Sequence, residues 1–84
     1  IHTPGHTPGS VCFFFGDALI SGDTLFYGSI GRTDFEGGSF AQISDSIQNK
    51  LFKLDENITV YPGHDAQTTI GYEKKYNSPF GKNN

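Results

Sequence analysis

The chain has 84 residues, a formal net charge of −3 and only six Lys and Arg residues, which are scattered and form no stripe that would bind nucleic-acid phosphates. The longest fully apolar run, residues 11–15, is far too short to span a bilayer, and these residues contain no signal-peptide pattern. We therefore expect no nucleic-acid partner, no membrane association and a cytoplasmic location.

The small size of the chain predicts marginal stability unless something else supports the fold. A chain of this length buries a modest fraction of its surface, and small domains usually add a disulfide, a metal or a partner. Cys12 is the only cysteine, which excludes an internal disulfide and favours a reducing compartment. The sequence lacks methionine and opens on an extended segment, so we expect it to begin inside a larger protein. A metal or a partner surface is the expected support.

The first half of the chain predicts two strands and a long loop. Residues 10–15 are β-branched and aromatic, and their continuous apolar run predicts a strand that is buried on both faces. Gly16 and Asp17 suit a two-residue hairpin turn, and residues 18–21 are expected to form the returning strand. Residues 22–38 hold five glycines and show no clear periodicity, which predicts a long ordered loop.

The second half predicts a helix, a strand and a second helix. Ser39 opens a capping-box pattern, so we expect a helix from there to about residues 54–55. Residues 58–61 predict a short strand, and residues 69–76 a second helix. This order indicates an α/β fold with a mixed sheet and the helices on one face. The apolar face of the first helix is expected to consist of Phe40, Ile43, Ile47 and Leu51.

Three residues of types that bind metals lie beside the predicted strands. His6 lies in a turn rich in Pro and Gly just before the first strand, whereas Asp23 and His64 each follow a strand. Strand ends can converge at one edge of a sheet, where α/β folds bind ligands. Imidazole and carboxylate together suit zinc or iron. Each residue taken alone is more simply explained as a turn residue or a cap.

Four segments, in the expected order, resemble the metallo-β-lactamase superfamily and its glyoxalase II-like branch. Residues 2–10 (HTPGHTPGS) resemble the third metal-binding segment of that family, and residues 21–26 (SGDTLF) resemble the segment with its bridging aspartate. Residues 28–35 (GSIGRTDF) resemble a loop of the glyoxalase II-like proteins and the persulfide dioxygenases. Residues 61–64 (YPGH) and 68–74 (TTIGYEK) resemble the last ligand segment. Together the segments cover nearly the whole chain, which makes the resemblance specific.

The resemblance implies that residues 1–84 are the C-terminal half of an αββα sandwich. It also implies that His6 binds a first metal ion, that His64 binds a second and that Asp23 bridges the two as the catalytic residue of this half. Two zinc ions are expected, with iron as the alternative, and such a pair activates a water molecule for attack on a carbonyl. The upstream H-x-H-x-D-H segment, which supplies the other four ligands in the family, is absent from this sequence.

In function, the resemblance implies a metal-dependent hydrolase of small thioester or acyl substrates, similar to hydroxyacylglutathione hydrolase, in the full-length protein. Because each metal would receive one His and a shared Asp from this chain, we expect weak metal binding and no substantial turnover by the chain alone. The N-terminal half of the same fold is the expected partner. Two alternatives stay open: an iron enzyme similar to the persulfide dioxygenases, and an inactive fragment that serves only as a structural half.

Four other residues have simple structural explanations. Arg32 and Asp34 are expected to form an ion pair that stiffens their loop. Asp65, beside the last histidine, is either a turn cap or a group that supports or replaces a metal ligand. Cys12 lies among bulky strand residues and is expected in the core.

Overall fold

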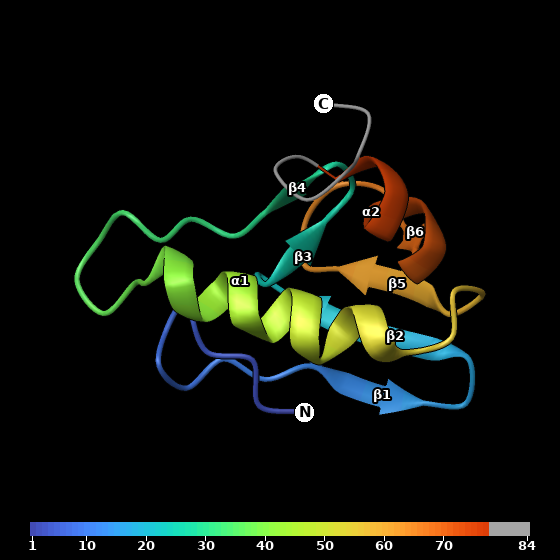
Figure 1. Ribbon diagram of the computed structural model, residues 1–84, viewed down its shortest axis with the longest axis horizontal. Coiled ribbons are helices and arrows are strands. Elements are labelled where there is room, and N and C mark those ends of the chain that lie inside the picture. Colours follow the sequence, from blue (N-terminus) through green and yellow to red (C-terminus); the bar gives the residue numbers. More distant parts are fainter. Residues whose placement is uncertain (78–84) are drawn as a thin grey trace.

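The computed structural model describes residues 1–77 as a mixed sheet, a small hairpin and two helices (Figure 1). The predicted order of strands and helices is confirmed, and four short elements are added to it. In chain order the elements are β1 (Phe13–Phe15), β2 (Ala18–Gly22), β3 (Leu25–Phe26), β4 (Ser29–Ile30), α1 (Phe40–Asn49), the 3-10 helix η1 (Leu51–Lys53), β5 (Thr59–Pro62), β6 (Thr68–Thr69) and α2 (Ile70–Tyr76).

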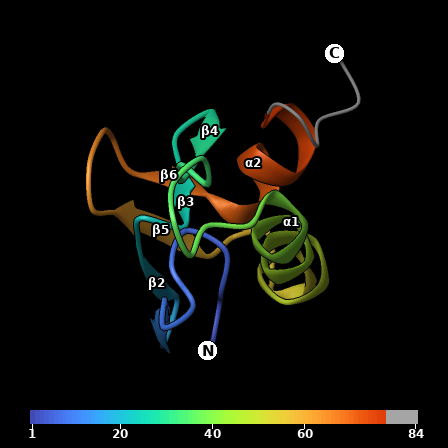
Figure 2. The ribbon, with the colours of Figure 1, turned by 90° about the vertical axis from the view of Figure 1, so that its left-hand side faces the viewer.

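Four strands form one sheet in the order β1-β2-β5-β6. Strands β2 and β5 run parallel, and the two outer pairs are antiparallel. The predicted hairpin is confirmed, because Phe15 pairs with Ala18 and Gly16 adopts the left-handed φ of 60° that the tight turn requires. Figure 2 shows α1 and α2 on the same side of the sheet. The fold is therefore α/β, with a mixed sheet and helices on one face, as the sequence predicted.

The hydrophobic core lies between the sheet and the helices. Leu19 on β2 and Val60 on β5 lie opposite each other, and both are fully buried. From α1, Ile43 and Ile47 are buried as predicted, whereas Phe40 in the first turn is 52 % exposed and does not belong to the core. The same core contains Cys12, Leu25, Leu51, Phe52, Ile58 and Ile70.

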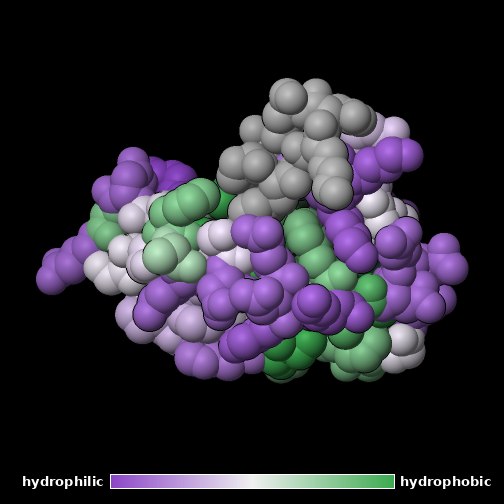
Figure 3. Space-filling view, in the orientation of Figure 1, coloured by the Kyte–Doolittle hydropathy of each residue, from purple (hydrophilic) through white to green (hydrophobic). Residues whose placement is uncertain are grey.

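The opposite face of the sheet is apolar but exposed. Phe13, Ile20 and Tyr61 lie side by side across β1, β2 and β5, and their exposed fractions are 63, 41 and 44 %. The expectation that residues 11–15 are buried on both faces is therefore wrong for this chain, in which Cys12 alone of the five is buried. Both helices pack on the other side, which leaves Phe13 and Phe15 uncovered. Phe14 lies on the helix side, opposite Leu19, but on the outer strand β1, and it is 43 % exposed. The surface over α1 on the helix side is mostly hydrophilic (Figure 3).

Several boundaries differ from the sequence-based expectations. Helix α1 begins after Ser39, whose hydroxyl accepts from the Gln42 amide as predicted, but it ends at Asn49 and continues only as η1. The predicted loop over residues 22–38 contains the β3–β4 hairpin, whose two-residue strands are too short to show a period in the sequence. No helix within residues 1–77 is long and apolar enough to cross a membrane.

Candidate metal centre

The sheet topology brings three chain segments to one edge. Because β2 and β5 are parallel, Asp23, directly after β2, and His64, two residues after β5, leave the sheet at the same edge. Strand β1 is antiparallel to β2, so the turn that precedes β1 and contains His6 also lies there. The convergence that the sequence predicted for these three residues is therefore present in the fold.

Asp23 lies between the two histidines. Its Oδ2 atom is 3.6 Å from His6 Nε2, and its Oδ1 atom is 3.4 Å from His64 Nε2. Two ligand atoms on one tetrahedral zinc ion, each about 2.0–2.1 Å from the metal, are about 3.4 Å apart. Each histidine therefore forms, with a different oxygen of Asp23, a pair of atoms spaced like two ligands of one ion.

The His6 ring is oriented by the loop that follows β4. Its Nδ1 atom is 2.9 Å from the Arg32 carbonyl oxygen, and Phe35 packs against the ring edge-on with the ring centroids 5.2 Å apart. A carbonyl only accepts, so Nδ1 carries the proton in this bond and a neutral ring keeps its lone pair on Nε2. That lone pair faces a carboxylate oxygen, and a cation between two such acceptors satisfies both.

The centre is open, and the described residues build it only in part. The side chains of His6, Asp23 and His64 are 22, 44 and 73 % exposed, and His64 rests on Phe26 with the ring centroids 5.9 Å apart. Within residues 1–77, no group of three or more His, Cys, Asp or Glu side chains surrounds a single metal position. The donor types and spacings fit metal ions, but this part of the chain forms two pairs of candidate ligands rather than a closed cage.

Two glycines allow the loops to approach Asp23 closely. A Cβ atom on Gly31 would overlap the Asp23 carbonyl oxygen and would lie 3.3 Å from His6 Cβ. A Cβ atom on Gly63 would lie 3.1 Å from the Gly22 carbonyl oxygen and 3.3 Å from Asp23 Oδ1. The absence of a side chain at both positions thus permits the short spacings between the candidate ligands.

The loop that orients His6 contains the predicted ion pair. Arg32 Nε donates to Asp34 Oδ1 at 3.0 Å, and this bond lowers the pKa of the Asp34 carboxyl below its usual value. Both side chains are about three-quarters exposed, so the pair adds little to global stability. The Arg32 guanidinium also lies over the Phe35 ring, 5.6 Å from the ring centroid. The predicted ion pair is thus present, in the same loop as the Arg32 carbonyl that contacts His6.

Asp65 lies in the bend that contains His64, and its φ of 70° is the only positive φ at a non-glycine residue within residues 1–77.

Sequence reasoning missed Glu73, which is fully buried beside the β3–β4 hairpin. The available signal was its position three residues after the buried Ile70, on the inner face of α2.

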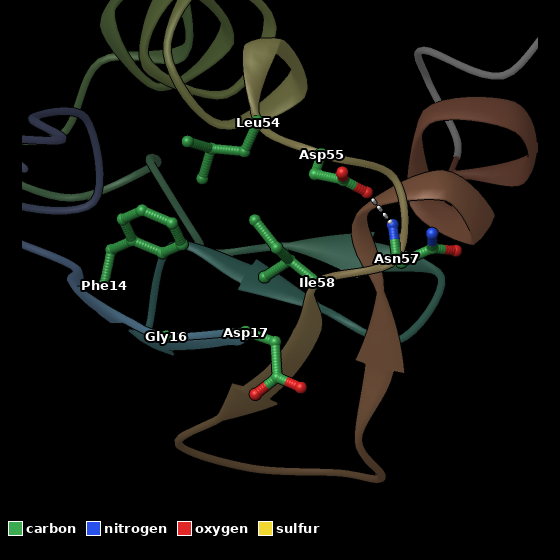
Figure 4. Close-up of a pocket in the computed structure, with 7 residues that line it drawn as sticks. All are labelled: Phe14, Gly16, Asp17, Leu54, Asp55, Asn57 and Ile58. Atoms are coloured by element: carbon green, nitrogen blue, oxygen red, sulfur yellow. Dashed lines mark hydrogen bonds between the residues drawn. The ribbon is translucent and has the colours of Figure 1, made fainter.

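A small pocket of about 280 Å³ lies at the opposite edge of the sheet, by the β1–β2 turn. Figure 4 shows Phe14, Leu54 and Ile58 pointing toward one another in this pocket, whereas Asp17 points away from them. None of the three candidate ligands lines it. The pocket is therefore separate from the metal centre.

Comparison with known families agrees with the motifs and the geometry. The family model described as the metallo-beta-lactamase superfamily matches residues 1–64. The chain belongs to this superfamily. The resemblance on which the sequence analysis relied is thus confirmed, and members of the superfamily are metal-dependent hydrolases.

Individual relatives are similar across almost all of this chain but are much longer. The hydroxyacylglutathione hydrolase GloC of Haemophilus influenzae is 45 % identical over 82 residues, which are 95 % of this chain and 38 % of that protein. The solved structure of BLEG-1 B3 metallo-beta-lactamase matches with a TM-score of 0.92 and 46 % identity, over 95 % of this chain and 39 % of that one. The structure of TTHA1623 in a di-iron-bound form matches with a TM-score of 0.88 and 40 % identity, over 93 and 40 % of the two chains.

Proposed function

We propose that this chain supplies one part of the dinuclear metal centre of a hydrolase that cleaves small thioester or related acyl substrates. The proposal is based on the orientation of the Asp23 carboxylate, whose Oδ2 atom faces His6 and whose Oδ1 atom faces His64. A carboxylate with its two oxygens directed at two separate imidazoles has the arrangement of a ligand that bridges two cations. The similarity to GloC, whose name states a hydroxyacylglutathione substrate, supports the thioester class.

In this proposal, His6 Nε2 holds one ion, His64 Nε2 holds the other and Asp23 binds both. Two zinc ions held by these residues would supply an activated water molecule for attack on a substrate carbonyl. In the neutral ring, the bond to the Arg32 carbonyl keeps the proton on Nδ1, so the lone pair of Nε2 faces the site and is available to a cation. The high exposure of His64 leaves the second half of the site open to a substrate.

We also infer that the exposed sheet face packs against the N-terminal half of the same fold, so that residues 1–84 form part of one domain. Phe13, Phe15, Ile20 and Tyr61 make this face apolar, and a sheet that is apolar on both faces is usually covered on both. The chain spans 38 % of the length of GloC, so a longer protein of this kind contains enough residues to cover the face. The missing metal ligands would come from the same half.

The test combines a zinc titration, followed through the ring resonances of His6 and His64, with hydrolysis of an S-acylglutathione. For the chain alone we expect both rings to respond, at an affinity weaker than about micromolar, and no substantial hydrolysis, because zinc sites normally need three or four protein ligands. Addition of the N-terminal half of GloC should tighten zinc binding and produce hydrolysis. Tight binding with turnover by the chain alone, or no response of either ring, would contradict the proposal.

A matched pair of variants tests the inferred packing. Ile20→Lys places a charge in the middle of the apolar face and should abolish the increases in zinc affinity and hydrolysis that the added N-terminal half produces. Gln48→Lys places the same charge on the exposed side of α1 and should leave those increases unchanged. Equal behaviour of the two variants would exclude this face as the contact surface.

An iron enzyme similar to the persulfide dioxygenases is a second candidate. The match to TTHA1623 in a di-iron-bound form supports iron as the metal, and the resemblance of residues 28–35 to the loop of the persulfide dioxygenases supports that activity. Metal analysis of the complemented protein and oxygen uptake with a persulfide substrate distinguish it from the hydrolase. Zinc binding without either activity would instead indicate a structural half.

A further inference from the structure

Glu73 is a fully buried carboxylate that joins the distant β3–β4 turn to β6 and to the end of α2. Its Oε1 atom accepts from the Gly28 amide at 3.0 Å and from Asn77 Nδ2 at 2.7 Å. Its Oε2 atom accepts from the Thr68 hydroxyl at 2.6 Å. Gly28 lies in the β3–β4 turn, Thr68 in β6 and Asn77 just after α2, so one side chain links all three.

Two of these segments continue directly from the proposed metal ligands. Gly28 lies five residues after Asp23, and Phe26 on the same hairpin packs against the His64 ring. Thr68 lies four residues after His64. Glu73 therefore ties the chain that leaves one ligand to the chain that leaves the other, at a point outside the ligand set.

A role in holding α2 alone does not account for this carboxylate. Two of its three donors belong to other elements, and the Asn77 side chain makes a further bond to the Ser29 carbonyl oxygen in the same hairpin. Burial of a carboxylate is unfavourable, and an apolar side chain would fill the same space without that cost. What Glu73 provides, and an apolar residue would not, is the attachment of the β3–β4 hairpin to β6 and α2.

We propose that Glu73 is a positioning residue of the metal centre. By fixing the β3–β4 hairpin it holds Phe26 against His64, and through Phe26 it sets the position of that imidazole relative to Asp23. The proposal rests on the proposed function only for the statement that His64 binds metal. The contact between Phe26 and His64 exists without metal and is measured separately.

The experiment compares Glu73→Ala, Glu73→Gln and a surface control, Glu56→Gln, in the 84-residue chain. Without metal, it measures the proton contacts between the rings of Phe26 and His64 by NMR and the exchange rate of the Gly28 amide. With metal, it measures the zinc affinity from the His64 resonances. Glu56 is an exposed partner of Lys74, so its variant should match the wild type in all three measurements.

In Glu73→Ala we expect the ring contacts to be lost, the Gly28 amide to exchange at least about tenfold faster and the zinc affinity to fall about tenfold, as for residues that support ligands. Glu73→Gln should restore all three values to within about threefold, because its amide oxygen still accepts from Gly28 and Asn77 and its NH₂ group donates to the Thr68 hydroxyl. Rescue by glutamine distinguishes positioning from a requirement for charge.

If Glu73→Ala does not fold, the near-isosteric Thr68→Val removes one of the three bonds and should give the same changes at a smaller size. The proposal is overturned if the ring contacts and the Gly28 exchange rate keep their wild-type values in the variant that folds. If the wild-type chain shows no zinc response at all, the proposed function fails, whereas the two measurements without metal still decide the role of Glu73.

Discussion

The Gly63 amide donates a hydrogen bond to the Gly22 carbonyl oxygen at 2.8 Å and so joins the ends of the two parallel strands β2 and β5. The two residues that follow these glycines, Asp23 and His64, are two of the three proposed metal ligands. The bond fixes the separation of the two strand ends immediately before Asp23 and His64. The two strand ends can approach this closely because Gly63 has no side chain.

Gly63→Ala should weaken zinc binding at His64. Its Cβ atom would lie 3.1 Å from the Gly22 oxygen and 3.3 Å from Asp23 Oδ1, so the turn that carries His64 must move away from the carboxylate. We expect a loss of zinc affinity of about tenfold, the size seen when the support of a ligand is removed. Zinc titration of the His64 resonances measures it. Gly9→Ala is the control, because a Cβ atom there meets nothing within 4 Å, and equal affinities in the two variants would contradict the argument.

Asp23→Asn should abolish the zinc response of both histidines at once. The amide keeps the shape of the carboxylate but replaces one oxygen by an NH₂ group, which has no lone pair available for a cation, and removes the negative charge that the remaining oxygen shares. Since Asp23 is 44 % exposed, we expect the free energy of unfolding to change by less than about 0.5 kcal/mol. Asp34→Asn, which breaks only the exposed pair with Arg32, should keep both responses. A wild-type titration of either ring in Asp23→Asn would show that the carboxylate does not bridge.

Ser46→Ala should destabilise the fold and loosen the turn that carries His6. Ser46 is 1 % exposed, and its hydroxyl donates to the Pro4 carbonyl oxygen at 2.8 Å, which attaches this turn to α1. Its removal leaves a carbonyl group without that donor and should lower the free energy of unfolding by about 1–2 kcal/mol. Urea unfolding measures the change. Ser44→Ala on the same helix but partly exposed should stay within about 0.5 kcal/mol of the wild type, and a similar loss in both variants would rule out this attachment as the cause.

The stability of the chain should fall at alkaline pH through Cys12. Burial raises the pKa of this thiol above its usual value of 9.0. As the pH rises above that value, the unfolded chain releases the thiol proton while the folded chain retains it, so the stabilisation that is complete below pH 9.0 is progressively lost. Urea unfolding at pH 8 and at pH 10 measures the decrease, which should be smaller in Cys12→Ala. Rapid reaction of Cys12 with a disulfide reagent in the folded chain at pH 8 would contradict its burial.

Much of the fold is visible in local sequence patterns. The hairpin at Gly16 and the cap at Ser39 depend on residues close together in the sequence, and both are confirmed. The predicted apolar face of the first helix is confirmed at Ile43, Ile47 and Leu51 but not at Phe40, which is exposed. The end of α1 was predicted less accurately, because apolar residues continue at helical spacing through η1 and the sequence does not show where the helix type changes. The β3–β4 hairpin was missed because two-residue strands carry no periodicity.

The candidate site was predicted in its residues but not in its geometry. Residue types and the sequences of short motifs identified His6, Asp23 and His64 as candidates, because a short segment is enough to recognise a motif. Their spacing depends on the parallel pairing of β2 with β5, two strands separated by a helix, and the orientation of His6 depends on a carbonyl 26 residues away.

The sequence by itself therefore determined the family, the order of the main elements and the identity of the three proposed ligands. Only the tertiary structure decided that each oxygen of Asp23 faces a different histidine, that one apolar face of the sheet stays exposed in this chain and that the carboxylate of Glu73 is buried. The physical reason is that propensities and caps act over a few residues, whereas contacts between distant segments follow from how the sheet and helices pack together.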